Sequence, residues 1–498
     1  MDDHYYPSVF SLQPIHLSSY PAFILDTPGK IPYGPQGSSP VQYIHYGRDG
    51  RGTWSRIMPG KKVKNRPSSA HPPEKKGLRA SVRKFVNKVP VAVRFALAMW
   101  LGTRLALTLI GVTGFKLMRS LEDWPYPWKY IEPLWLDIWS LWDSGWYLEI
   151  ARFGYSTERI SDLPKFVEEG QLNYAFFPLY PLFMRWVGTA VGSPYIGGLI
   201  VSNVCMIAAC FFLYKLVMDQ ENDESAALRA VKYLFLMPAA FVFTGIFSES
   251  MFVMLLLGSF YYAAKRRWFR AGAFGFLMCL TRSIGVFMVM PLGFEYLRSI
   301  GFNFRDFTET IRPGGFTPGN VFGAAGRFCW KNLMKVRANV LLLLLVPAGF
   351  LVYSAYIHIS TGGRLSYFAV QKAGGWDLAG TNPLTLLYES FVRPHWMFQF
   401  FGALFSSLGL LALAASFRRL RFSHFMAGVL LIVVPLCSGQ AKLLSMQRFL
   451  IVVFPLMIVC ALGTRKRSVD SILTATLALI QGFLMFLWCV FWFTRMVV

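Results

Sequence analysis

Long apolar runs recur from about residue 89 to the end of the chain, separated by short polar or basic connectors. An α-helix needs about 20 apolar residues to cross a bilayer, and many of these runs approach that length. The pattern therefore predicts an all-α polytopic membrane protein with about 11 transmembrane helices. The expected spans are 89–112, 174–191, 195–218, 228–246, 249–264, 271–297, 338–358, 397–416, 422–438, 448–463 and 470–493.

The basic connectors indicate how these spans are oriented, because Lys and Arg in short loops favour the cytoplasmic side. Those that we expect on that side are 265–267, 298–337, 418–421 and 465–467. The segments then left outside are 113–173, 359–396 and 439–447. The first of them is a large external loop, in which we expect interfacial helices.

Strict alternation of sides does not fit this assignment. The connectors before and after 271–297 are both basic, so one ordinary span cannot separate them. We expect a broken or re-entrant segment there, interrupted at Thr281-Arg282-Ser283, and the pair 174–191 and 195–218 is the other suspect. A charged break is costly unless it faces a cavity or protein, which makes Arg282 a candidate site residue. A kink held by neighbouring helices is the open alternative.

Residues 1–88 differ from the rest, being rich in Pro, Gly, Ser and Tyr, with fourteen Lys or Arg against five Asp or Glu. This composition predicts a disordered basic cytoplasmic arm. The basic residues nearest the first span are suited to contact anionic lipid. We therefore divide the chain into this arm, 1–88, and a multi-pass transmembrane domain, 89–498.

Amino-acid composition limits the classes of molecule that we expect this protein to bind. The chain is 54% hydrophobic with a formal net charge of +24. Positive-inside topology explains that charge, since the chain carries no zinc-finger or RNA-binding signature, so we expect membrane lipid and no nucleic acid as its partner. Seven cysteines without a CxxC pair favour packing roles over a disulfide framework or a metal knuckle. The chain also lacks a Walker loop and an HExxH motif.

An acidic and aromatic segment lies at 142–155, within the first external loop. Helical spacing places Trp142, Trp146 and Glu149 on one side, with Asp143 and Tyr147 one turn apart on the neighbouring face. Trp and Tyr favour the headgroup level, so Asp143 would lie at the depth of a lipid headgroup. An aromatic belt helix with an incidental acid is the alternative.

An ordered set of motifs resembles the PIG-V type mannosyltransferases, that is, GPI mannosyltransferase 2 and its relatives, and is more similar to the prokaryotic ones. The motifs are Trp-Asp-x-x-x-Tyr-x-x-Ile-Ala-x-x-Gly-Tyr at 142–155, Phe176-Phe177-Pro178-Leu179-Tyr180-Pro181, Ser248-Glu249-Ser250, Thr281-Arg282 and Met446-Gln447-Arg448-Phe449. The resemblance implies a GT-C type glycosyltransferase bundle whose first external loop carries an essential acid.

The resemblance also implies a function. The expected reaction moves mannose from a polyprenyl- or dolichyl-phosphate donor to a lipid-linked acceptor, such as a glycosylphosphatidylinositol precursor or another glycolipid, by inverting displacement. The expected place is the extracytoplasmic face of a bacterial cell membrane, or the luminal face of the endoplasmic reticulum in a eukaryote. A partner membrane subunit belongs to the same expectation, because the eukaryotic enzymes of this type are thought to need one.

Two charges carry the expected chemistry. Displacing a lipid phosphate from an anomeric carbon requires a base for the acceptor hydroxyl, and Asp143 is our candidate, with Trp142 positioning the loop or stacking on a sugar. A fixed cation would stabilise the leaving phosphate, and Arg448 at the external start of a span is the best choice. Arg282 and Lys442 are second choices. A snorkelling residue at a helix end is the alternative for each cation.

Other residues are expected to shape the substrate pocket. Phe177 and Pro178 belong to a predicted helix start, since two prolines three residues apart are tolerated only near a first turn. Core packing is the alternative there. Trp146 and Tyr147 are expected to contact substrate. Glu249 is expected to bind a loop or a sugar hydroxyl, or else to cap a helix.

We expect no cofactor and no required metal. Asp137, Asp143, Glu149 and Glu158 share one loop, but their spacing does not place three around one ion, so a divalent cation is only the alternative. Competing functions are a secondary transporter or lipid flippase, and a non-catalytic scaffold subunit. Against transport, the charged motifs gather on one predicted face and no internal repeat is evident.

Overall fold

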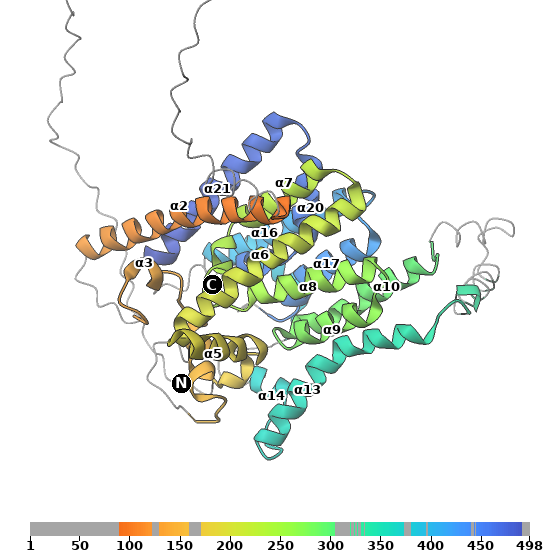
Figure 1. Cartoon of the computed structure of the whole chain (residues 1–498), viewed down its shortest axis with the longest axis horizontal. Coiled ribbons are helices and arrows are strands. Elements are labelled where there is room, and N and C mark those ends of the chain that lie inside the picture. Colours follow the sequence, from red (N-terminus) through yellow and green to blue (C-terminus); the bar gives the residue numbers. More distant parts are fainter. Residues whose placement is uncertain are drawn as a thin grey trace, which may run out of the picture. The chain divides into compact units, whose positions relative to one another are not determined.

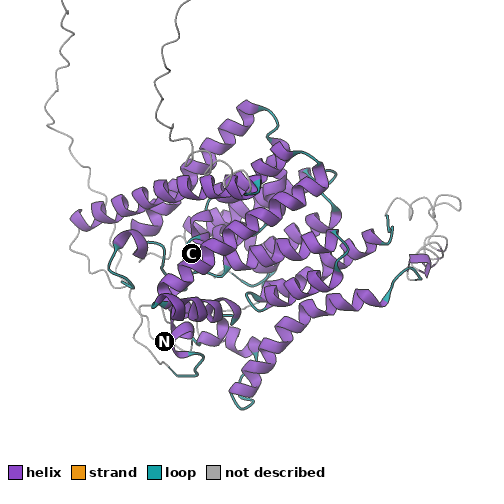
Figure 2. Cartoon of the chain, in the orientation of Figure 1, coloured by secondary structure: helices purple, strands orange, loops and turns teal. Residues whose placement is uncertain are grey.

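The structure, a computed structural model, describes residues 89–121, 129–158, 171–303, 334–372, 380–394, 397–439 and 445–490, with a few isolated positions between 319 and 332 and at 443. The predicted arm, 1–88, lies outside the described residues. The described residues belong to one compact unit, Lys75–Val498. They form helices and connecting loops with no strand among them, as Figure 2 shows, which confirms the all-α prediction.

The helices that matter for the site follow one another along the chain (Figure 1). In order they are α2 (Val91–Leu121), α3 (Leu134–Asp137), α4 (Ser144–Phe153), η1 (Asn173–Ala175), α5 (Leu179–Val191), α6 (Pro194–Glu221), α7 (Glu224–Leu236), η2 (Ala240–Phe243), α8 (Glu249–Ala264), α9 (Trp268–Cys279), η3 (Ser283–Met288), α10 (Val289–Ser299), η5 (Ala338–Leu344), α13 (Leu345–Ser360), α14 (Tyr367–Lys372), α15 (Pro383–Val392), α16 (Met397–Ala415), α17 (Phe422–Leu436), α19 (Met446–Leu450), α20 (Phe454–Gly463) and α21 (Arg467–Val490).

Four helices in the described part of the chain are long and apolar enough to cross a membrane: Val91–Leu117, Pro194–Glu221, Ala338–Ser360 and Arg467–Cys489. Four shorter apolar helices accompany them: Glu249–Ala264, Gln399–Ala415, Phe422–Leu436 and Phe454–Gly463. The chain is therefore a membrane protein by helix length and composition. The expected number of about 11 spans stays a prediction.

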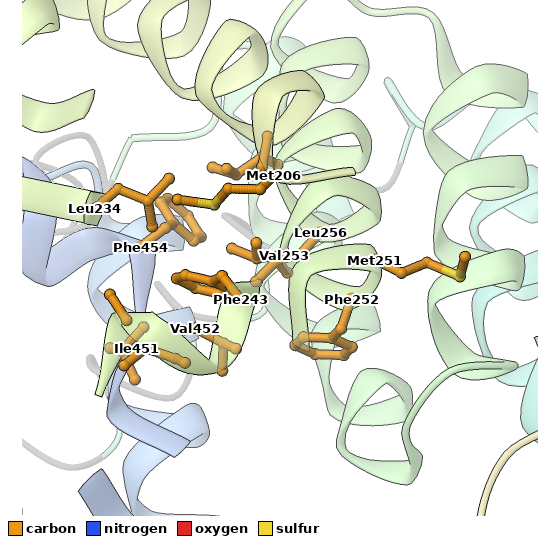
Figure 3. Packing of buried hydrophobic residues seen from close by; sticks show 14 of the residues in the cluster. Met206, Leu234, Phe243, Met251, Phe252, Val253, Leu256, Ile451, Val452 and Phe454 are labelled. Atoms are coloured by element: carbon orange, nitrogen blue, oxygen red, sulfur yellow. The ribbon is translucent and has the colours of Figure 1, made fainter. Parts of the chain in front are cut away.

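A buried apolar core joins the central helices. Figure 3 shows part of it, where Met206 of α6, Leu234 of α7, Phe243 of η2, Val253 of α8 and Phe454 of α20 come together. Close packing of buried side chains holds the backbones that carry them in fixed positions. The core therefore fixes the starts of α8 and α20 relative to each other, and the site lies next to both.

The basic connectors meet at one end of the helices, which we call the basic end. There Lys265 Nζ lies 2.7 Å from Asp219 Oδ2, which joins the last turns of α8 and α6. Lys232 in α7 lies 2.6 Å from Asp470 at the start of α21. Arg298 pairs with Glu295 at the end of α10, and Arg421, just before α17, lies 3.6 Å from the same carboxylate. The connectors expected to share a side of the membrane are thus neighbours.

The expected span 271–297 is broken, as the sequence predicts. Helix α9 ends at Cys279, and the chain turns through 280–282 into η3 and α10. The connector 265–267 before α9 and the end of α10 both lie at the basic end, so this segment runs to the break and returns. That course explains why both flanking connectors are basic.

The expected span 174–191 has a different form. It is the 13-residue helix α5, which packs against the first turns of α6. The Tyr180 hydroxyl lies 2.7 Å from Ser202 Oγ near the start of α5. Near its end, a Cβ on Gly197 would lie 2.5 Å from the backbone nitrogen of Gly188. The contacts move from Ser202 back toward Pro194 as α5 runs from Tyr180 to Gly188, so α5 packs antiparallel along the first turns of α6. Its 13 residues are fewer than the roughly 20 that a span needs.

Two other expected spans are interrupted by proline. The segment 228–246 consists of α7 and η2 with Pro238 between them, and 448–463 consists of α19 and α20 with Pro455 in the first turn of α20. Proline lacks a backbone N–H and disfavours helical geometry in the residue before it. The interruption between α7 and η2 precedes the start of α8, and the second follows α19, so both lie beside the site.

Candidate active site

Four segments distant in sequence converge on one cluster of charged side chains. Asp143 immediately precedes α4, and Glu249 is the first residue of α8. Arg282 lies in the break between α9 and η3, and Arg448 lies in the short helix α19. Each residue occupies a helix end or a break, where side chains can turn toward one another across the bundle. We call these four residues the charge cluster.

The central contact joins Asp143 and Arg448. Arg448 Nη1 donates a hydrogen bond of 2.5 Å to Asp143 Oδ2. The guanidinium carbon also lies 5.5 Å from the ring centres of Phe247 and Phe449, so the cation is held between aromatic rings. Arg448 is 8% exposed and Asp143 is 21% exposed. The carboxylate is thus the more accessible partner.

Glu249 joins both arginines. Its Oε1 accepts a hydrogen bond of 2.6 Å from Arg282 Nη1 and lies 3.3 Å from Arg448 Nε. The side chain is only 1% exposed, and among the described residues its other oxygen, Oε2, has no hydrogen-bond partner. A buried carboxylate between two guanidiniums fixes their spacing through charge-assisted contacts.

A hydroxyl network ties α4 to this cluster. The Tyr147 hydroxyl donates to Ser248 Oγ at 2.8 Å, and Arg282 Nη1 lies 3.4 Å from the same Ser248 oxygen. Burial, reinforced by the nearby Glu249 carboxylate, raises the pKa of the Tyr147 phenol above its ordinary value. The phenol therefore stays protonated and keeps donating.

Asp143 is presented by a strained turn. Trp142, the residue before it, has φ of 52°, in the left-handed region that residues with a side chain rarely occupy. Ser144 Oγ anchors the other side of the turn by donating to the Ile246 carbonyl at 3.2 Å. Such strain persists only where the surroundings enforce it, and it is common at functional sites. Here it aims Asp143 at Arg448.

A protein-family model matches the part of the chain that contains three of the four residues of the charge cluster. Residues 129–313 match the family model described as Mannosyltransferase (PIG-V). This segment is similar to the PIG-V mannosyltransferases. The match covers less than half of the chain and includes Asp143, Glu249 and Arg282. It agrees with the resemblance expected from the sequence over this segment.

Solved structures show weaker likeness. The chain is similar to the oligosaccharyltransferase of Archaeoglobus fulgidus in its apo form, with 13% identity and a TM-score of 0.36, covering 80% of this chain and 56% of that one. For the archaeal enzyme in complex with an inhibitory peptide and a dolichol-phosphate, the identity is 12% and the TM-score is 0.37. The match again covers 80% of this chain and 56% of that one. The chain thus spans little more than half the length of these structures. No curated protein matches it.

The start of α5 lies next to the break that carries Arg282. Pro178 precedes the helix as its N-cap, and the Leu179 N–H donates to the Leu280 carbonyl at 3.0 Å. That bond ties the start of α5 to the break that carries Arg282. Phe177 packs against Tyr353, with ring centres 4.7 Å apart. The expected helix start is therefore present, and the expected substrate role of Phe177 and Pro178 stays a prediction.

Two expectations about substrate contact need correction. The Trp146 ring stacks on Phe176 at 5.8 Å, and Tyr147 packs edge-on against Phe176 and Tyr180 at 5.1 Å each. Both side chains lie in the core, so neither offers a free ring face to a sugar. Apolar burial favours this packing over exposure at the headgroup level. Their role in the structure is to position α4 and thereby Asp143.

The remaining acids of the loop have structural partners. Asp137 Oδ1 accepts the backbone N–H groups of Tyr130 and Ile131 at 2.9 and 3.1 Å. Glu149 Oε1 accepts from the Asn173 amide at 3.1 Å. Within the described ranges, no three His, Cys, Asp or Glu side chains gather as metal ligands. Lys442 lies outside the described residues.

Sequence reasoning missed three parts of the site. Ser248 bridges Tyr147 and Arg282, and Phe247 with Phe449 encloses the Arg448 guanidinium. Ser248 and Phe449 belong to the motifs that carry the family resemblance, so the sequence contained a signal that could have identified them as site residues. Nothing in the order of residues along the chain, however, shows that these motifs meet.

Proposed function

We propose that this protein transfers a mannosyl residue from a polyprenyl- or dolichyl-phosphate donor to a lipid-linked acceptor at the charge cluster. The observation that carries the proposal is the 2.5 Å contact between Asp143 and Arg448, residues 305 positions apart. It brings a partly exposed carboxylate and a fixed cation to one place. These are the two charges that displacement of a lipid phosphate requires.

The proposed reaction is a single inverting displacement. The acceptor hydroxyl oxygen forms a bond to the anomeric carbon while the bond from that carbon to the phosphate oxygen breaks. The electron pair of the broken bond leaves with the lipid phosphate, and Asp143 takes the hydroxyl proton. In the reacting complex the two side chains would have parted, with Asp143 on the acceptor side of the sugar and Arg448 on the side of the leaving group.

The observed ion pair suggests an order of binding. The donor carries a phosphate diester whose negative charge competes with Asp143 for Arg448 Nη1. Arg448 has several N–H donors in a planar fork and can hold phosphate oxygens while Glu249 keeps its Nε side in place. Donor binding would thereby release Asp143 to accept a proton. Base activation is coupled to arrival of the donor in this scheme.

The proposed location follows from the basic end. If that end faces the cytoplasm, the charge cluster, which lies at the other ends of α8 and α9, faces the extracytoplasmic or luminal side. A lipid-phosphate sugar is the donor class suited to that side. The acceptor class we propose is a glycolipid, such as a glycosylphosphatidylinositol precursor.

A donor panel tests this proposal. Membranes containing the full chain are supplied in parallel with radiolabelled polyprenyl-phosphate mannose, polyprenyl-phosphate glucose and GDP-mannose, and lipid-extractable product is measured. The membranes come from cells unable to make lipid-phosphate mannose, so that GDP-mannose cannot be converted to it. We expect label only from polyprenyl-phosphate mannose. Label from GDP-mannose or from the glucosyl lipid would contradict the proposed donor.

A further inference from the structure

A pocket lies at the basic end, away from the charge cluster. It has a volume of about 400 Å³ and is lined by residues from the connector after α8 and from α9, α10 and the start of η5. The lining residues are Arg266, Trp268, Tyr296, Ser299, Ile300, Lys335, Arg337 and Asn339. Helix α9, about 18 Å long at 1.5 Å per residue, separates this pocket from the break at Arg282.

The charge of this pocket is one-sided. Three of the eight lining residues are cations, namely Arg266, Lys335 and Arg337, and none is acidic. All three are exposed, and in the described part of the chain none of them forms an ion pair. Nearby basic residues behave differently, since Lys265 and Arg421 are paired with acids. Three unpaired cations around one cavity attract an anion.

The pocket is held in shape by a buried hydroxyl. Tyr296, 2% exposed, accepts the backbone N–H of Arg337 at 3.0 Å and lies 2.9 Å from Asn339 Oδ1. Its ring packs on Trp268 with centres 4.8 Å apart. The walls from α9, α10 and η5 are therefore fixed before any ligand arrives, which lowers the entropic cost of binding.

The backbone of Arg266 has an unusual conformation for an arginine. Its φ of 56° is in the left-handed region, where glycine or asparagine would be the ordinary residue. The turn is closed by the Arg266 N–H donating to the Ala263 carbonyl at 2.9 Å. An arginine at a position that favours glycine has a conformational cost. In return, this arginine supplies a third cation to the pocket.

The rim of the pocket indicates which anion fits. Leu341 and Leu344, on η5 just beyond Asn339, are 60% and 59% exposed. Residues three apart share one face of a 3₁₀ helix, so these side chains form an apolar strip that starts beside the cations. A phospholipid fits this arrangement, because its phosphate would meet the cations and its acyl chain would follow the apolar strip. Basic pockets between membrane helices on the cytoplasmic side are suited to such headgroups.

We infer that this pocket binds the phosphate headgroup of an anionic phospholipid, with an acyl chain along Leu341 and Leu344. This site is separate from the proposed transfer site and does not depend on it. The ligand would be a resident lipid of the leaflet that faces the basic end.

The test is a binding titration with the full-length chain in neutral detergent. Fluorescent phosphatidylglycerol is the probe, and fluorescent phosphatidylcholine is the zwitterionic reference. The pocket variant is Arg266→Gly with Arg337→Gln, in which glycine suits the observed φ. The matched control is Arg418→Gln with Arg419→Gln, two exposed cations at the same end that do not line the pocket.

We expect the pocket variant to bind phosphatidylglycerol about fivefold more weakly for each cation removed, with phosphatidylcholine and the control variant unchanged. Equal weakening in the control, or unchanged binding in the pocket variant, would overturn the inference. Inorganic phosphate serves as a soluble competitor, and displacement by it as effectively as by unlabelled lipid would point to a soluble anion instead. Arg337→Gln alone carries the test if the double variant misfolds.

Discussion

At the scale of single residues, the charge cluster is a balanced set of two guanidiniums and two carboxylates. Each buried member is stabilised mainly by the others, because an ion removed from water depends on its partners. Glu249 contacts both Arg282 and Arg448, whereas Asp143 contacts Arg448 and keeps some exposure. We therefore assign Glu249 to positioning and Asp143 to chemistry.

Neutralising Glu249 tests this division. Glu249→Gln leaves two arginines without their shared carboxylate, and we expect a loss of about 3 kcal/mol or more in unfolding free energy. Thermal unfolding of the purified chain measures it. Glu132→Gln is the control, since Glu132 is exposed and, among the described residues, forms an ion pair only with Lys129. It should change stability by less than about 0.5 kcal/mol. Equal effects in the two variants would contradict the positioning role.

Arg448→Lys tests contact with the donor phosphate. Lysine keeps the charge but loses the planar fork, so at least one charged hydrogen bond is lost. We expect the KM for the lipid-phosphate donor to rise about tenfold or more while the KM for acceptor stays unchanged. Arg465→Lys at the basic end is the control. A change confined to the acceptor KM would remove Arg448 from the leaving-group side.

The candidate chemistry could be chosen from sequence because its motifs are short and contain unusual charges in apolar surroundings. Asp143, Glu249, Arg282 and Arg448 were all candidates before any geometry, and the structure brings these four together. Their pairing could not be predicted, because which helix ends meet depends on tertiary packing. Burial of Trp146 and Tyr147 was missed for the same reason.

At the scale of elements, broken segments shape the site. The break at 280–282 was predicted from a charged residue within an apolar run and from basic connectors on both sides. The pair 174–191 and 195–218 was the other suspect, but the sequence did not show that the first of them forms only the 13-residue helix α5. This helix is held by a close crossing on α6, where Gly188 meets Gly197.

That crossing can be tested with one methyl group. A Cβ at Gly197 would lie 2.5 to 2.8 Å from Gly188 backbone atoms and from the Met184 carbonyl, none of which can rotate away. We expect Gly197→Ala to cost about 2 kcal/mol in unfolding free energy and to lower transfer, because α5 carries part of the wall of the site. Gly102→Ala, with nothing within 4 Å, is the control. Unchanged stability in Gly197→Ala would contradict the crossing.

At the scale of the whole molecule, the described helices have a basic end and, at their other ends, the charge cluster. Connectors expected on one side of a membrane from their charge are neighbours at the basic end. The all-α class and the membrane environment followed from apolar run length alone. The number of spans did not, because α5 and the interrupted helices break the relation between apolar runs and crossings.

Labelling in intact cells tests the proposed orientation. Thr157, exposed in the first loop, and Arg418, exposed in the connector after α16, are replaced singly by cysteine in a background without the native cysteines. We expect a membrane-impermeant thiol reagent to label Thr157→Cys from the extracytoplasmic side and Arg418→Cys only after the membrane is opened. Labelling in the reverse pattern would place the charge cluster on the cytoplasmic side.

The most direct test of the central claim is transfer of radiolabelled mannose from polyprenyl-phosphate mannose into lipid by membranes containing wild type, Asp143→Asn or the control Glu158→Gln. Asparagine keeps the shape of the side chain but cannot accept the hydroxyl proton. We predict labelled product with wild type and Glu158→Gln, and a loss of about a hundredfold or more with Asp143→Asn at equal protein level and unchanged fold. Turnover by Asp143→Asn at the wild-type rate would contradict the assignment of Asp143 as the base.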